Sequence, residues 1–304
     1  MKKTILSFLC VIVLMMCAFG VTGCSRSVYL YENCDNFLVG GTTLEDITLS
    51  SIDIDWVCGS VEVEISSETE NLVIEESYSK QLKDEEKLRY LLDETGSLII
   101  KFRQSTNQKV NLDIKKSLII KVPATLASAN KINISTESAS VKIKGQNIIS
   151  SCNIAEINIK SSSGEVVVGG LNASSLKAES VSGNVSINTC LITNVEINTT
   201  SGGLYTQDLI CIQLNLSTIS GASKCKFSTA PSLIYVKSTS GSNEVQLPET
   251  IEGYEVEFTT KSGRYSSEFF EKAESGKRIY GENISCRLHF ETVSASVAIK
   301  KYVS

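Results

Sequence analysis

The 304-residue sequence contains a single histidine, His289, and no CxxC pair among its ten cysteines. Histidine is the usual general base and, with cysteine, the usual zinc ligand, so neither a nucleophile–base pair nor a metal-ligand spacing is present. No phosphate loop occurs either. Asp53 and Asp55 share one strand face in a coil expected to cap the fold, and are interpreted as solvated rather than catalytic. We therefore expect no enzyme, cofactor or metal site, and keep a carbohydrate-active β-helix enzyme as the third of three candidate functions.

What the sequence has in quantity is a repeat. Ser-Gly recurs at an interval of 19 residues, at Gly164, Gly183, Gly202 and Gly221, and continues at Gly241 and Gly263 at intervals of 20 and 22. Three weaker copies surround Gly59, Ala139 and Ala295, with Cys58 in the serine place of the first. A fixed period of this size indicates a repeat architecture.

Apolar and polar residues alternate on both sides of each glycine, which is the strand signal. Seven positions before the glycine stand Ile157, Leu176, Val195, Leu214, Ile234 and Val256. One coil cannot bury its apolar row, whereas stacked coils bury it continuously, and the small glycine permits the sharp bend between two strands. We predict an all-β fold, a β-solenoid (parallel β-helix) with coils of about 19 residues. The alternative is a β-sandwich of hairpins.

The first residues have the pattern of a secretory signal. The chain begins with Lys2 and Lys3, an apolar run from Ile5 to Phe19, and Val21-Thr22-Gly23-Cys24. Residues 1–23 are predicted to be a signal peptide. The cysteine after Gly23 resembles a bacterial lipobox, which implies cleavage before Cys24 and a diacylglyceryl group on its sulfur. The alternatives are an ordinary signal peptide or a single membrane helix, for which the run is short. Residues 24–45 are predicted to be a lipidated tether.

Removal of residues 1–23 changes the formal charge from −5 to −7, because Lys2 and Lys3 are the only charged residues lost. An acidic chain is a poor nucleic-acid binder and slightly favours cationic partners. Seven cysteines outside the signal and the lipobox remain: Cys34, Cys58, Cys152, Cys190, Cys211, Cys225 and Cys286. Their number is odd and they share no repeat column, so we interpret them as small buried hydrophobic residues.

Residues 46–130 are predicted to be a β-rich N-terminal part that caps the repeats of residues 131–304, the two forming one folded unit. Ser79–Leu92 predicts a short helix or the first half of a hairpin. Leu88–Asp93 and Ser97–Phe102 would pair as that hairpin. Leu118–Pro123 predicts a further strand that ends at proline.

The order of these features is informative. The lipobox is followed by Ile52–Val63, by Leu118–Pro123, by the Ser-Gly repeats, and by a closing copy at Thr292–Lys300. This set resembles the DUF4097 family, often labelled "putative adhesin", over roughly residues 45 to 304. The resemblance implies a β-helical bacterial surface or envelope protein and supplies no catalytic residues. The chain departs from the pattern at Cys58, Ala139 and Ala295, where small residues should preserve the turns.

Two columns of hydroxyl side chains accompany the repeat. The column directly before the glycine contains Ser138, Ser163, Ser182, Ser201, Ser220, Ser240, Ser262 and Ser294. The column two residues earlier contains Thr136, Ser161, Ser180, Thr199, Thr218, Ser238, Thr260 and Thr292. Both columns share the strand parity of the apolar columns, so both are predicted to point inward and to bond the backbone. The alternative is an outward ladder that binds glycan or ice.

On the outer face, Lys160 with Glu179, and Lys177 with Glu196, are predicted to meet between adjacent coils as surface ion pairs. Late in the chain stand Tyr254, Phe258, Tyr265, Phe269, Phe270 and Tyr280. Tyr254 and Phe258 are expected in the core or cap. Phe269-Phe270 is either part of the cap or an exposed patch that binds a partner.

These patterns predict a non-enzymatic bacterial surface lipoprotein, extracytoplasmic and anchored to the cell membrane by lipid on Cys24. It would act as an adhesin-like scaffold for a glycan, a protein or an envelope component. The alternative is a sensor or regulator of cell-envelope stress that binds a membrane protein or a cationic peptide.

Overall fold

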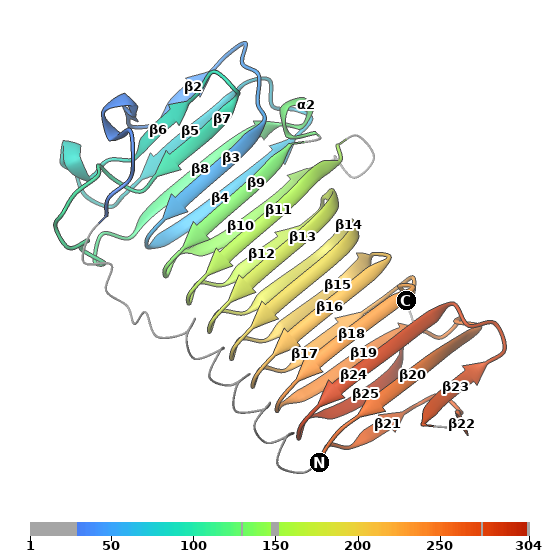
Figure 1. The fold of residues 1–304 in the computed structure, drawn as a ribbon. Helices are drawn as coiled ribbons and strands as arrows, with labels where there is room; N and C mark the ends of the chain where they lie inside the picture. The colour runs from blue at the N-terminus through green and yellow to red at the C-terminus, as the bar shows by residue number, and fades with distance from the viewer. Residues whose placement is uncertain (1–28, 129, 147–151, 275, 303–304) are drawn as a thin grey trace.

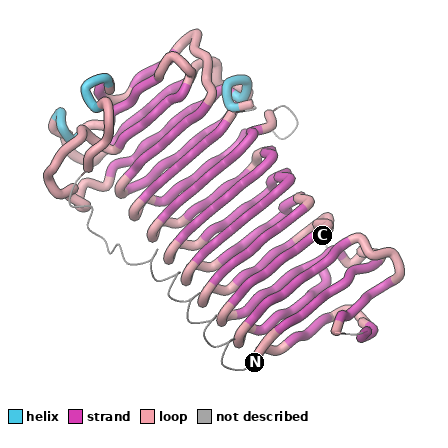
Figure 2. The backbone as a smooth tube through the Cα atoms, viewed as in Figure 1, coloured by secondary structure: helices cyan, strands magenta, loops and turns pink. Residues whose placement is uncertain are grey.

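The computed structural model describes residues 29–128, 130–146, 152–274 and 276–302. It contains one continuous sheet of 25 strands, arranged as a long stack (Figure 1). Three short helices, η1 (Cys34–Asn36), η2 (Asp84–Glu86) and α2 (Ala124–Ala127), lie at the N-terminal end (Figure 2). The predicted all-β class is confirmed. The signal peptide and Cys24 lie outside the described residues, and within those residues no helix is long and apolar enough to cross a membrane.

The strands form two ladders that run the length of the stack. In spatial order the first ladder consists of β1 (Leu38–Val39), β6 (Arg89–Leu92), β7 (Ser97–Lys101), β3 (Ser51–Trp56), β9 (Lys131–Thr136), β11 (Ile154–Ser161), β13 (Asn172–Ser180), the second half of β14 (Val185–Thr199), β16 (Gln213–Thr218), β18 (Leu233–Ser238), β24 (Cys286–Thr292), β20 (Gly253–Thr259), β23 (Lys277–Gly281) and β22 (Lys272–Glu274). The second consists of β2 (Thr42–Leu44), β5 (Leu72–Ser77), β8 (Lys116–Pro123), β4 (Gly59–Ser66), β10 (Ser140–Gln146), β12 (Val166–Gly169), the first half of β14, β15 (Leu204–Ile210), β17 (Ser223–Lys226), β19 (Ser242–Pro248), β25 (Ser296–Tyr302) and β21 (Tyr265–Ser267).

Neighbouring repeats pair in parallel, each residue opposite its counterpart in the next copy. Ile157 lies opposite Leu176, which lies opposite Val195, so the register reproduces the 19-residue spacing of the sequence. The same column continues through Leu214, Ile234, Leu288 and Val256. A sandwich of hairpins would pair neighbouring copies antiparallel, which this register does not show.

The core lies between the two ladders. Along each strand, buried and outward residues alternate with period two, as in Ile52, Ile54 and Trp56 on β3 and Val61, Val63 and Ile65 on β4. The inward side chains form one continuous apolar cluster from the N-terminal cap to Ile299 on β25. Stacking therefore buries what a single coil leaves exposed.

Two coils lie out of chain order. The coil β7/β8 lies outside β3/β4, although it follows β3/β4 in sequence. At the other end, β24/β25 lies between β18/β19 and β20/β21. Figure 1 shows β24 and β25 between β19 and β20. The coil of Asp53 and Asp55 was expected to cap the fold, and that expectation is wrong, because another coil covers it.

Antiparallel strands close both ends. The predicted hairpin is present, with Arg89 opposite Lys101 and Leu92 opposite Leu98. Ser79–Leu92, left open between helix and strand, contains one short helical turn, η2, and then β6. Leu118–Pro123 falls in β8, as predicted. At the C-terminal end β20 pairs antiparallel with β23, so each end presents a short terminal strand rather than an open coil.

The predicted tether of residues 24–45 is too long. Tyr29 is buried, and its hydroxyl donates to the Asp55 carbonyl at 3.0 Å and accepts from the Phe102 N–H at 3.0 Å. β1 and β2 add to the edges of the two ladders. The chain is therefore packed from Tyr29 onward, because the ends of the ladders need covering.

The repeat glycines are needed for close approach between coils. A Cβ on Gly183 would overlap the Gly164 carbonyl oxygen of the coil before it, and one on Gly202 would overlap that of Gly183. Neither glycine has a left-handed φ. Ala139 and Ala295 each follow, in the stack, a glycine with a left-handed φ (Gly59 at 101°, Gly241 at 113°).

The two hydroxyl columns face different ways. The earlier column is buried apart from half-buried Thr260, and Ser161 and Thr199 donate to the carbonyls of Gly164 and Gly202 at 3.1 and 2.9 Å. The prediction for the column directly before the glycine is wrong: it lies on the surface, with only Ser240 half-buried. Each strand ends at the earlier column or one residue before it, so the alternation of inward and outward side chains does not continue into the turn. These outer serines still bond a neighbouring coil, as Ser201 does by donating to the Val181 carbonyl of the coil before it at 3.3 Å.

The late aromatic residues form the C-terminal cap. Tyr254 is fully buried, and its ring packs edge-on against Phe269 with centroids 5.3 Å apart. Phe258 is half-buried against the core. Phe269 and Phe270 divide between the two interpretations: Phe269 is 6% exposed and caps the core, whereas Phe270 is 83% exposed.

The seven cysteines of the described residues are all free, and only Cys34 is not buried. Burial raises the pKa of the Cys190 thiol to about 11 and that of Cys225 to about 12. Raised pKa values keep thiols protonated and unreactive. The six buried cysteines are therefore core residues, as predicted, whereas the prediction is wrong for Cys34.

We expect iodoacetamide to alkylate Cys34 in the native protein at least tenfold faster than Cys225, because only the thiolate reacts and Cys225 is buried and protonated. Peptide mapping by mass spectrometry over a time course would measure both rates. In concentrated urea the two rates should converge. Comparable native rates would contradict the buried position of Cys225.

Candidate functional site

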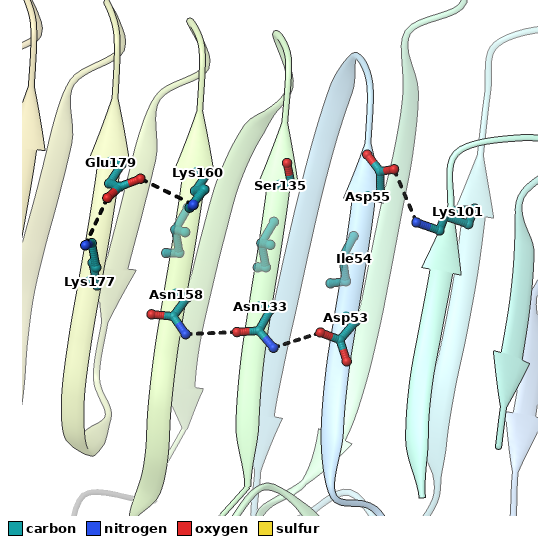
Figure 3. Close-up of a pocket in the computed structure, with 12 residues that line it drawn as sticks. Asp53, Ile54, Asp55, Lys101, Asn133, Ser135, Asn158, Lys160, Lys177 and Glu179 are labelled. Atoms are coloured by element: carbon teal, nitrogen blue, oxygen red, sulfur yellow. Dashed lines mark hydrogen bonds and ion pairs between the residues drawn. The ribbon is translucent and has the colours of Figure 1, made fainter. Parts of the chain in front are cut away.

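The outer face of the first ladder is a continuous polar surface. On β3, β9, β11 and β13 the outward residues alternate with buried aliphatic ones, so each strand presents a polar residue at every second position. A hollow of about 480 Å³ lies on this face near the N-terminal end. Its polar lining comes from β7, β3, β9, β11 and β13 (Figure 3) and includes Asp53, Asp55, Lys101, Asn133, Ser135, Asn158, Lys160, Lys177 and Glu179.

One row of the hollow is a chain of hydrogen bonds across three coils. The Asn158 amide donates to the Asn133 side-chain oxygen at 2.9 Å, and the Asn133 amide donates to Asp53 at 2.7 Å. Ser51 also donates to Asp53, at 2.6 Å. These bonds fix the orientation of each amide, so the row presents a defined set of donors and acceptors to a ligand.

The second row is ionic. Lys101 pairs with Asp55 at 3.3 Å, at the edge nearest the cap. Further along, Glu179 lies between Lys160 at 3.7 Å and Lys177 at 3.1 Å. The hollow therefore contains both charge signs, which suits a polar ligand with donors and acceptors, such as a glycan or a peptide backbone.

The predicted surface ion pairs are both present. Lys160 with Glu179, and Lys177 with Glu196 at 3.2 Å, join neighbouring coils. Contacts with Glu179 and Glu196 raise the pKa of Lys177 above its ordinary value. Asp53 and Asp55 share a face as predicted. Each has its own hydrogen-bond or ionic partner, so they do not form a facing carboxylate pair.

The same face continues toward the C-terminal end as a cluster around His289. Its two ring nitrogens lie 3.2 Å from Glu257 and 3.3 Å from Glu291, and its ring stacks on Tyr235 with centroids 5.2 Å apart. A hydrogen bond from Tyr235, with His289 and Lys237 nearby, lowers the pKa of Glu291. Within the described parts of the chain, no three His, Cys, Asp or Glu side chains are placed to hold a metal ion.

The outer face of the second ladder also carries ion pairs between neighbouring strands. Lys144 bridges Glu62 at 2.8 Å and Glu64 at 2.7 Å. Near the other end, Glu244 pairs with Lys300 at 2.6 Å and Lys224 at 3.1 Å, and these contacts, Lys300 first, lower the pKa of Glu244 to about 2. We take the hollow of the first ladder as the candidate site, because an ordered amide row and an ionic row lie side by side there.

The amide row and the place of Lys101 beside Asp55 are not apparent from the sequence. Asp53, Asn133 and Asn158 occupy one repeat column, which is a visible signal. However, Asp53 and Asn133 are 80 residues apart, and nothing in the sequence places β3 beside β9. The position of Lys101 depends on the coil that lies out of chain order.

The family model described as Toastrack DUF4097 matches residues 49–296. The chain belongs to the DUF4097 family. The match includes the repeats, the coil β7/β8 and the strand β24, and ends at the first residue of β25. It confirms the resemblance drawn from the sequence.

Solved structures of similar proteins are known. A "putative adhesin" from Bacteroides fragilis is 13% identical with a TM-score of 0.48, covering 87% of this chain and 97% of its own. A "putative lipid binding protein" from Parabacteroides distasonis is 14% identical with a TM-score of 0.45, covering 86% of this chain and 96% of its own. A "putative cell adhesion protein" from Clostridium sporogenes is 13% identical with a TM-score of 0.25, covering 88% and 100%. No curated protein matches the chain.

Proposed function

We propose that this DUF4097 protein is a non-enzymatic binding scaffold, adhesin-like, anchored by lipid on Cys24 at the extracytoplasmic face of a bacterial membrane. The stack would be a β-solenoid with coils of about 19 residues, matching the register of Ile157, Leu176 and Val195. The supporting observation is the hollow of the first ladder, where a hydrogen-bonded amide row lies beside an ionic row on the outer face of the sheet. A ligand would be held by hydrogen bonds to these groups, with no bond made or broken.

The test is capture by the full chain, purified in detergent. The baits are host glycans and matrix proteins on one side, and solubilised envelope of the producing cell on the other. The scaffold reading expects an external ligand, retained at physiological salt. Capture of only an envelope protein or a cationic peptide would overturn the adhesin reading and support the sensor alternative.

We predict that Asn158→Ala weakens binding of the captured ligand about tenfold, because it removes one polar contact and leaves the Asn133 side-chain oxygen without its amide donor. A tenfold change in Kd corresponds to about 1.4 kcal/mol of binding free energy. Asn215→Ala is the matched control, since Asn215 occupies the same column on β16 but does not line the hollow. Titration by calorimetry would compare both variants with the wild type. Equal affinities for all three proteins would place the ligand elsewhere.

A further inference from the structure

We propose that the N-terminal end of the stack rests on the membrane surface and that the loop of residues 104–115 contacts the lipid headgroups. This inference rests on the proposed lipid at Cys24 and adds an orientation to it. The C-terminal end of the stack would then be the part farthest from the bilayer.

The first observation is how early the chain becomes fixed. Tyr29 is buried, and its backbone N–H and carbonyl bond Thr106 at 2.9 and 2.8 Å. Only residues 25–28 separate Tyr29 from Cys24. Five Cα–Cα steps span at most about 17 Å. A lipid on Cys24 would therefore hold the surface around Tyr29 within that distance of the bilayer.

The second observation is what this surface carries. Leu30 is 62% exposed beside the backbone bridge to Thr106, and Leu112 in the same loop is 47% exposed. Lys109 and Lys115 are also exposed there, with Asp113 as the one acidic residue of the loop. Exposed leucines beside lysines suit the boundary between headgroups and acyl chains. The mature chain is acidic overall, so the anchor rather than bulk charge would impose this contact.

The third observation concerns the neighbouring edge. Leu38 and Val39 are both exposed on β1, the terminal strand of the first ladder, and the Phe37 ring lies 5.0 Å from Tyr31. Leu30, Leu38, Val39 and Leu112 are four of the ten large apolar residues exposed in the described chain. They belong to the same end as the point where the chain enters the fold.

The orientation has a direct optical test. Trp56 is the sole tryptophan and lies in the second coil from the N-terminal end. Phe270 follows β21 in the tenth coil, which is eight coil spacings or about 38 Å further along. The full lipidated chain would be placed in phosphatidylethanolamine–phosphatidylglycerol vesicles that carry dansyl headgroups, and energy transfer from tryptophan measured.

We expect efficient transfer from Trp56, and transfer several-fold lower from the double variant Trp56→Phe with Phe270→Trp. Replacing Leu112 by Asp, Lys109 by Glu and Lys115 by Glu together should reduce Trp56 transfer. Ile212→Asp, at an exposed apolar position far from this end, should leave it unchanged. Equal transfer from the two tryptophan positions would mean that the stack lies flat, and would overturn the orientation.

A second measurement needs no variant. Trypsin cleavage after Lys109 and Lys115 should be slower in vesicles than in detergent, while cleavage after exposed Lys261 is unchanged. If the rate in vesicles equals the rate in detergent at each of the three sites, the proposed contact is overturned. Mass spectrometry of the Cys24 peptide separates the two proposals. An unmodified sulfur removes the anchor and this inference together, whereas a lipidated sulfur with equal transfer removes the orientation alone.

Discussion

Replacing Lys116 by methionine should lower the free energy of unfolding by about 3–5 kcal/mol, because it leaves a buried carboxylate without its cation. Lys116 on β8 is fully buried between the rings of Trp56, 4.9 Å away, and Phe102, 4.2 Å away. Its ammonium group donates to Glu76 at 2.6 Å and to the Glu86 carbonyl at 2.6 Å, and also to the Phe102 carbonyl.

Two controls separate charge from packing. In Lys116→Met combined with Glu76→Gln, both buried charges are absent, so part of the lost stability should return. Lys121→Met lies on the same strand and breaks the surface pair with Glu75 at 2.9 Å, which should cost no more than about 1 kcal/mol. Urea unfolding of the four proteins measures the differences. A loss below about 1 kcal/mol for Lys116→Met would contradict the buried pair.

The pH dependence of this site has a defined sign. Burial outweighs the attraction of Glu76 and lowers the pKa of Lys116 from 10.5 to about 8. Between these two pH values the unfolded chain binds the proton and the folded chain does not, so this group makes stability rise with pH. The wild type should gain stability relative to Lys116→Met over that window. The surface lysines with raised pKa values are common to both proteins and cancel in the difference.

Replacing Gly202 by alanine should lower the free energy of unfolding by about 3 kcal/mol, because the new methyl group meets backbone that cannot move aside. A Cβ there would overlap the Gly183 carbonyl oxygen, which is held in the stacked turns. Gly202 does not have a left-handed φ, so backbone strain is not the cause.

Gly169→Ala is the matched control for this collision. A Cβ on Gly169 would lie 3.3 Å from the Asn188 carbonyl oxygen, a close contact that small shifts relieve. Both variants reduce the freedom of the unfolded chain equally, so their difference reports the folded state. Urea midpoints for both proteins test it. Equal losses would show that the corner glycines are not in close contact.

Most of what the sequence predicts correctly about the fold comes from the repeat columns. Ile157, Leu176 and Val195 occupy one sequence column and one register position, because each 19-residue copy stacks directly on the last. The outward position of Ser201 was missed because strand parity does not extend through a turn. The position of Leu288 next to Ile234 was also beyond the sequence, because every copy offers the same apolar column. The coil at the C-terminal end of the stack is β20/β21, and its strand β20 pairs antiparallel with β23.

For the hollow, the sequence indicates the residue types but not the contacts. Asp53, Asn133 and Asn158 stand in one column, yet their hydrogen bonds depend on which coil neighbours which. Asp55 meets Lys101 only because β7 lies outside β3. Local periodicity predicts the direction of a side chain, whereas the order of the coils depends on pairings between segments that are far apart in the sequence.

The position of β24/β25 also bears on synthesis of the chain. Of the described coils, the last to leave the ribosome is an interior one, with β18/β19 on one side and β20/β21 on the other. A nascent chain can complete the stack only as far as β19, and residues 253–267 have no partner coil until the final strands arrive. A chain cut between residues 268 and 285 would therefore contain β20 and β21 without the coil on which they pack.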